Sequence, residues 1–160
     1  MTFDNSKTII SLRIKLFAAT IIFLAYIALT YVAKLIKFPL LGMSDTTLTI
    51  ILVVIYLIIA FLPMILNYQF VYYSDDTEKI IFRYFTAGIV GGRKNTVQID
   101  KKTFSGYTIE ASLFGLRQKI TLYQRFNEGI ATYPPFYISA LSRIEKAKMV
   151  KSLNLYAPPA

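Results

Sequence analysis

The acidic side chains are the first candidates for chemistry, because a chain without histidine or cysteine must use carboxylates, lysine, tyrosine or serine. Asp75 and Asp76 are adjacent in a predicted turn, so we expect their side chains to diverge. Asp100, Glu110 and Glu128 lie on separate predicted strands or turns, and no nucleophile stands beside a base. The sequence therefore predicts a protein that is not an enzyme and that has no metal site and no cofactor.

A glycine-rich loop at residues 86–94, TAGIVGGRK, is the most distinctive local motif. Its glycines would let backbone N–H groups approach an anion, and Arg93 and Lys94 add positive charge. The loop is not a nucleotide-binding P-loop, because the spacing differs and no helix opening with Lys-Ser or Lys-Thr follows. Glycines that shape a hairpin turn are the favoured explanation, and membrane headgroups would be the nearest anions.

Basic residues are concentrated in the second part of the chain. Residues 68–160 carry thirteen Lys or Arg against seven Asp or Glu, a net charge of +6. Seven of these residues are candidates for one patch that binds anionic lipid headgroups or a partner protein: Arg83, Arg93, Lys94, Lys101, Lys102, Arg117 and Lys119. The alternative is a scatter of solvated charges. The chain has no helix-turn-helix or RNP-like pattern, so we expect no nucleic-acid partner.

Two apolar segments must position these residues relative to a membrane. Residues 47–66 contain no charge over twenty positions, which at about 1.5 Å per residue is enough to cross roughly 30 Å of hydrocarbon. Residues 16–33 are also uncharged and are flanked by lysines that can extend the span. We predict transmembrane helices at about 14–36 and 47–66, preceded by a polar flank. A cleaved signal peptide is disfavoured, because the first run is long and a second span follows.

The connection at residues 38–46 contains Pro39 and Gly42 and predicts a tight return between antiparallel helices. Most Lys and Arg residues lie in the N-terminal flank and downstream of the second span, which places both termini in the cytoplasm. Lys34 and Lys37 run against this rule, since they would lie at the outer face. There they are candidate contacts for acidic groups of a partner subunit.

Downstream of residue 67 the apolar period changes from helical to alternating. Alternation and turn residues predict strands at 70–73, 78–85, 96–100, 107–111, 118–124, 130–133 and 136–138. Ser142 and Glu145 form a capping box for a C-terminal helix over 142–153. The domains expected are a hairpin over 1–67, a β domain over 68–155 and a frayed tail at 156–160.

Three stretches resemble the bacterial pleckstrin-homology-like (PH-like) domains found in small two-span membrane proteins. They are the hairpin at 72–85, LFGLRQKI at 113–120, and YPPFYISAL at 133–141, within a region from Phe70 to Leu153. The resemblance implies a small antiparallel β-barrel or sandwich with a C-terminal helix, held beside a bacterial inner membrane as a binding module. The loop at 74–77 is acidic, whereas eukaryotic relatives that bind phosphoinositides have a basic loop there.

These observations predict a fold of the membrane α + β class and a non-enzymatic interaction module. We expect an accessory, assembly or scaffolding subunit of a larger membrane complex, supported by an ample supply of Tyr and Phe for contacts. The alternative function is a sensor of anionic lipid headgroups at the cytoplasmic leaflet.

Overall fold

The chain divides into two compact units, which are described separately. The computed structural model describes residues 1–40, 42–87, 92–127 and 129–157. One unit, the helical hairpin, comprises Ile10–Ile65; the other, the β domain, comprises Met1–Ile9 together with Leu66–Ala160. The expected boundary after residue 67 therefore misplaced the first nine residues, which are part of the β domain.

The helical hairpin contains α1 (Ser6–Ile27) from Ile10 onward, the π-helix η1 (Ala28–Val32) and α2 (Asp45–Ile65). The first helix begins earlier than the predicted residue 14 and ends before 36, because Lys34 adopts a left-handed φ of 52°. Ser6–Val32 and Asp45–Ile65 are both long and apolar enough to cross a membrane. Almost none of their residues is buried, unlike those of a helix in a soluble core.

Hydroxyl groups and aromatic rings connect the two helices of the hairpin. Thr20 and Tyr56 hydroxyls lie 3.1 Å apart, and those of Tyr26 and Thr49 lie 2.8 Å apart. The rings of Phe23 and Tyr56 stack with centroids 4.9 Å apart. Polar side chains in apolar helices are stabilised by such pairing, because lipid offers them no alternative partner.

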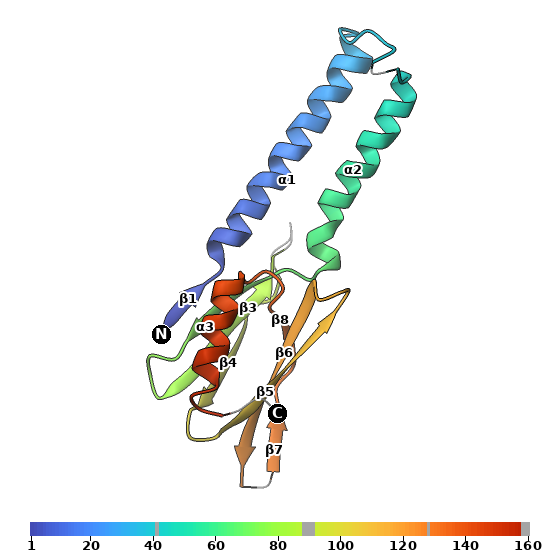
Figure 1. Ribbon diagram of the computed structural model, residues 1–160. Helices are drawn as coiled ribbons and strands as arrows, with labels where there is room; N and C mark the ends of the chain where they lie inside the picture. The colour runs from blue at the N-terminus through green and yellow to red at the C-terminus, as the bar shows by residue number, and fades with distance from the viewer. Residues whose placement is uncertain (41, 88–91, 128, 158–160) are drawn as a thin grey trace. The chain divides into compact units, whose positions relative to one another are not determined.

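The first sheet of the β domain has the antiparallel order β1-β2-β3-β4 (Figure 1). Its strands are β1 (Thr2–Asp4), β2 (Gln69–Ser74), β3 (Lys79–Thr86) and β4 (Asn95–Asp100). Strand β1 was expected to be a polar flank, and it pairs instead with β2 through Phe3 and Tyr73. In β3, alternate residues such as Ile80 and Phe82 are fully buried while Arg83 is exposed, as the period of two predicts.

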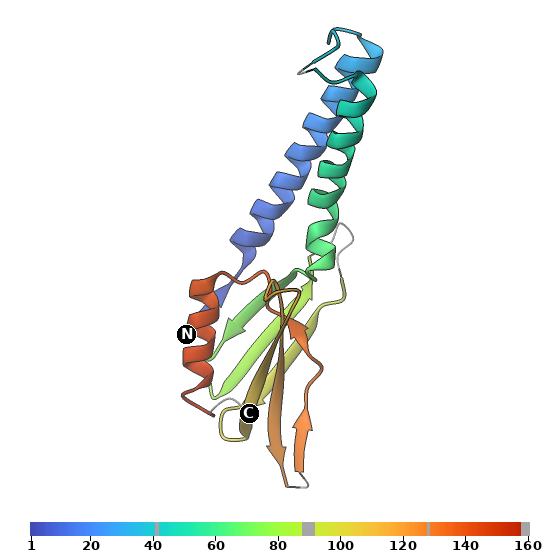
Figure 2. The same cartoon turned by 45° about the vertical axis from the view of Figure 1, so that its right-hand side comes forward.

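The second sheet is organised around β6 (Arg117–Phe126), which pairs with β5 (Phe104–Ser112), β7 (Gly129–Thr132) and β8 (Phe136–Tyr137). The two sheets are seen separately in Figures 1 and 2. No barrel is closed in the part of the chain that the structure describes, so of the two expected forms, barrel or sandwich, the barrel is wrong. Strands β4 and β5 follow one another but belong to different sheets, which leaves both as edges.

The main hydrophobic core of the described residues joins both sheets to the C-terminal helix α3 (Arg143–Leu153). Met149 and Leu153 of α3 are fully buried against Tyr73, Phe82 and Phe136, among others. The predicted capping box opens this helix, with both of its reciprocal hydrogen bonds formed.

The segment that follows α3 is not the expected frayed tail where the structure describes it. Tyr156 packs against the core and Ala157 is buried. The remaining tail residues, 158–160, lie outside the described residues.

Candidate functional site

The amino-terminal end of β6 holds a basic side chain against the segment that follows α2. The guanidinium of Arg117 lies 4.7 Å from the ring centroid of Tyr137 and donates to its hydroxyl at 2.6 Å. The Asn67 side-chain oxygen, turned toward the guanidinium, accepts from Nη2 at 2.5 Å and from Nε at 3.2 Å. The Tyr137 backbone N–H donates to Gln69 Oε1 at 2.9 Å. Arg117 is therefore fixed in place, which lowers the entropy that binding an anion would cost.

A hollow of about 230 Å³ lies beside Arg117 and is lined by Glu110, Ala111, Ser112, Arg117, Lys119 and Tyr137. Lys119 Nζ lies 3.1 Å from Glu110 Oε2, an exposed ion pair that contributes little to stability. Guanidinium and ammonium donors side by side are suited to phosphate or carboxylate oxygens. The hollow is the best-formed anion-binding candidate among the described residues.

The other basic residues predicted for the patch are distributed along the first sheet. Arg83 is exposed on β3, with its guanidinium carbon 5.4 Å from the ring centroid of Tyr72. Arg93 and Lys94 are exposed just before β4 begins.

Lys101 and Lys102 lie just after the other end of β4, and Lys101 Nζ is 4.8 Å from the ring centroid of Tyr156. Because β4 has six residues at about 3.3 Å each, Lys101 and Lys102 lie roughly 20 Å from Arg93 and Lys94. The structure thus brings Arg117 and Lys119 together but does not gather all seven residues into one patch.

Lys34 and Lys37 are exposed in the connection between the two helices of the hairpin. Their predicted contact with acidic groups of a partner subunit stays a prediction.

Part of the glycine-rich loop, residues 88–91, lies outside the described residues. Gly92 is described, and a Cβ atom at this position would lie 2.9 Å from Thr86 Cβ. Close approach between the two sides of the loop therefore explains this glycine, without any need for a bound phosphate.

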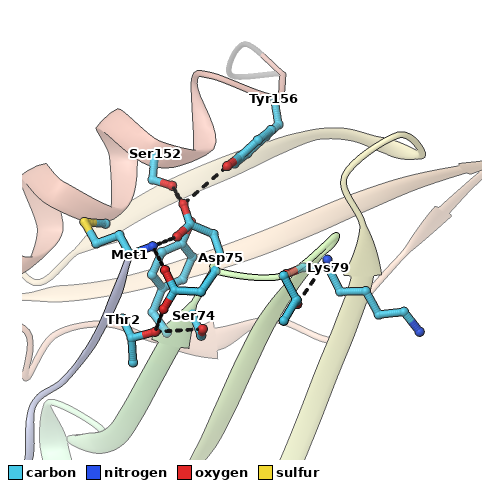
Figure 3. A network of polar contacts seen from close by, with 10 residues as sticks. Met1, Thr2, Ser74, Asp75, Lys79, Ser152 and Tyr156 are labelled. Atoms are coloured by element: carbon cyan, nitrogen blue, oxygen red, sulfur yellow. Dashed lines mark hydrogen bonds and ion pairs between the residues drawn. The ribbon is translucent and has the colours of Figure 1, made fainter.

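Asp75 and Asp76 converge, whereas adjacent turn residues were expected to diverge. Both carboxylates accept hydrogen bonds from the Met1 amine, and Ser152 of α3 donates to Asp75 (Figure 3). The Tyr73 hydroxyl lies 2.7 Å from that of Ser152.

Burial opposes ionisation of Asp75, but the hydrogen bonds from Met1 and Ser152 outweigh it and hold its pKa below the ordinary value. The Asp75 cluster joins α3 to the end of β2, so we interpret it as structural.

Asn5 is a fully buried polar residue that the sequence analysis missed. Its Nδ2 donates to the Gln69 carbonyl at 2.9 Å, and its Oδ1 accepts from the Val71 N–H at 2.9 Å. Asn5 therefore joins the segment that enters α1 to the segment that leaves α2. Its place directly before a long helix was the available signal, since asparagine is a common residue at helix starts.

Strand β7 forms an open edge of the second sheet. All four of its residues are exposed, including Ile130 at 60%, and Phe126 at the adjoining end of β6 is 53% exposed. A largely apolar hollow of about 300 Å³ lies beside it, lined by Ser105, Tyr123, Ile130 and Thr132. Among the described residues, β7 pairs with β6 alone. Unpaired backbone groups next to exposed apolar side chains can accept a further strand.

Comparison of the chain with protein-family models, with curated proteins and with solved structures finds no match. Among the described residues there is no group of three or more acidic, histidine or cysteine side chains that could hold a metal ion. The function must therefore be argued from the surfaces described above.

Proposed function

We propose that this protein is a membrane-anchored, non-enzymatic interaction module whose β domain docks on other membrane-protein subunits. In this proposal it is an accessory, assembly or scaffolding subunit in a bacterial inner membrane, with both termini in the cytoplasm. Two helices able to cross a membrane support the anchor. Two antiparallel sheets with a C-terminal helix are compatible with a PH-like domain, which we retain as part of the proposal.

The open edge of β7 is the observation that carries this proposal. The Tyr133 N–H donates to the Leu122 carbonyl at 2.9 Å, so the alternation of an antiparallel ladder directs the N–H groups of Ile130 and Thr132 away from β6. An extended segment of a partner could pair with these groups while the exposed Ile130 and the neighbouring hollow receive its side chains. Strand addition of this kind is a common mode of peptide recognition.

Replacing Thr132 tests the proposal, because Thr132→Pro removes an outward N–H without removing a hydrogen bond to β6. Thr132→Val keeps that N–H and serves as the matched control. Both full-length variants would be purified from native membranes in mild detergent, and associated proteins quantified by mass spectrometry. We expect the valine variant to retain partners that the proline variant loses. A solitary protein, or equal recovery with both variants, would contradict the proposal.

Arg117 and Lys119 favour a second candidate function, recognition of anionic lipid headgroups. Both lie at the hollow beside Asn67, two residues after α2 ends. Native mass spectrometry of the full-length protein would measure how much anionic lipid remains bound after extraction. We expect less with Arg117→Gln than with Arg83→Gln, which removes an exposed arginine on the other sheet. Equal retention by these two variants would refute this candidate.

A further inference from the structure

The turn between β5 and β6 exposes an unusual amount of apolar surface. We call its residues 113–116, Leu-Phe-Gly-Leu, the apolar tip. The exposed fraction is 46% for Leu113, 61% for Leu116 and 106% for Phe114, which makes no shielding contact with the rest of the domain. Contiguous exposed apolar residues on an otherwise polar surface mark a site of interaction.

The backbone of the apolar tip is that of a tight hairpin turn. The Leu116 N–H donates to the Leu113 carbonyl at 3.1 Å. Leu113, Phe114 and Gly115 all have left-handed φ angles, of 52°, 56° and 84°, and the last two fit the central positions of a type I′ turn. Asparagine, aspartate or glycine is preferred at the first of these positions, because a left-handed φ is unfavourable for other side chains. Phenylalanine there contributes neither turn propensity nor core packing, so its presence points to a contact outside the domain.

The position of the apolar tip is given by the residue that follows it. Arg117 is hydrogen-bonded to Asn67, and Asn67 stands two residues after the end of α2. Arg117 is three positions after Phe114, so their Cα atoms lie at most about 10 Å apart. The interfacial layer of a bilayer is about 5–8 Å thick on each side of the hydrocarbon. If α2 spans the bilayer, Asn67 lies at this layer, and Arg117 links the apolar tip to Asn67.

The two ends of β6 carry different groups that could make contacts outside the domain. The β5–β6 turn and the β6–β7 connection lie at opposite ends of this strand (Figures 1 and 2). The apolar tip is followed by Arg117 and Lys119, an order in which apolar side chains would enter the lipid and basic ones would remain at headgroup level. At the other end, β7 offers backbone groups for pairing.

We propose that the apolar tip inserts into the interfacial layer of the leaflet in which α2 ends, as a third membrane contact of the β domain. Leu113, Phe114 and Leu116 enter between the headgroups, and their transfer from water supplies the driving force. The contact limits rotation of the β domain about its two connections to the hairpin. This inference rests on the membrane anchoring proposed above, and it requires neither a protein partner at β7 nor anionic lipid.

A single environment-sensitive fluorophore can test insertion, because the chain has no cysteine that would compete for labelling. Ser112→Cys places the label next to an unaltered apolar tip, and Ile130→Cys places it on exposed β7 as the control. The full-length protein would be reconstituted without any other protein into phosphatidylcholine nanodiscs. We expect a blue-shifted emission and quenching by headgroup-proximal lipid nitroxides at position 112, and neither effect at position 130.

A triple variant, L113S/F114S/L116S, separates insertion of the tip from anchoring of the chain. It should still float with vesicles, since α1 and α2 are unchanged, while the label at position 112 loses its blue shift and its quenching. The three side chains are exposed, so the near-ultraviolet circular dichroism of the tyrosines should not change. A label at position 112 that is in water with the natural tip, or that stays in lipid with the serine tip, overturns the inference. Failure of the natural chain to float would instead refute the membrane anchor.

Discussion

Removing the side-chain amide of Asn5 should destabilise the β domain more than any exposed polar substitution. Asn5→Ala leaves the buried Val71 N–H and the Gln69 carbonyl without their partners. An unsatisfied buried group costs about 1–3 kcal/mol, and the Gln69 carbonyl lies in a half-buried residue that water can partly compensate. The expected loss in the free energy of unfolding is therefore about 2–4 kcal/mol. Since 1.4 kcal/mol is a factor of ten, this corresponds to roughly 30- to 700-fold in the unfolding equilibrium.

Hydrogen exchange of the full-length protein in detergent measures this loss directly. Core amides of β3, such as that of Phe82, exchange through opening of the domain, so their rates should rise by the same factor. Gln98→Ala is the matched control, because Gln98 is an exposed amide on β4, and its effect should stay within about 0.5 kcal/mol. Equal exchange in the two variants would refute the assignment of Asn5 as a structural link.

Asn5→Asp adds a test that depends on how the stability of the variant changes with pH. Its carboxylate can still accept from the Val71 N–H, but a second oxygen faces the Gln69 carbonyl and the charge is buried. Burial raises the pKa of such a carboxyl group in the folded state, so the folded protein binds more protons than the unfolded chain. We expect this variant to be less stable than Asn5→Ala at pH 7 and to recover as the pH falls toward about 4. A stability difference that is independent of pH would contradict this argument.

Three further predictions concern the remainder of the β domain. Ser142→Ala removes the capping box of α3 and should lower the free energy of unfolding, measured with denaturant, by about 1 kcal/mol. Ser139→Thr keeps a hydroxyl outside the cap and should lower it by less, so equal losses would contradict the role of the cap. Phe82→Ala should lower the free energy of unfolding by about 3–5 kcal/mol, because Phe82 is fully buried in the core. A loss below about 1 kcal/mol would show that the core does not depend on Phe82. The folded-state pKa of Asp75 lies below its unfolded value, so the stability that it contributes is present above about pH 4 and is lost as the pH falls through the lower value. Asp75→Asn should therefore lower the melting temperature at pH 7 and weaken its fall in acid, and an unchanged acid profile would be the contrary result.

Periodicity in the sequence was sufficient to predict most elements of this protein. Strands β2 to β8 and helix α3 lie within a few residues of the predicted ranges, because alternation and capping are local properties of consecutive residues. The two apolar helices were recognised for the same reason, since the length of an uncharged run needs no knowledge of the fold. Strand β1 was not predicted, because three residues are too few to show an alternating pattern.

Residue spacing also showed which kinds of side chain were available for function, but not where they would meet. The seven basic residues were visible as a set, yet only the register of β6 brought Arg117 and Lys119 to one hollow. Likewise, Asn5 lies 64 positions from Gln69, and Arg117 lies fifty positions from Asn67. No local pattern encodes such pairs, because strand order and packing bring them together.

The sequence by itself determined that the chain has two apolar helices and a basic, alternating region ending in a capped helix, since charge, hydrophobicity and period are written residue by residue. Only the tertiary structure decided that the described sheets stay open, that the first residues complete one of them, and that Phe114 lies outside the core of its own domain. These features depend on which strand edges are paired and which side chains are buried in the core. That outcome is settled by packing between residues far apart in the chain.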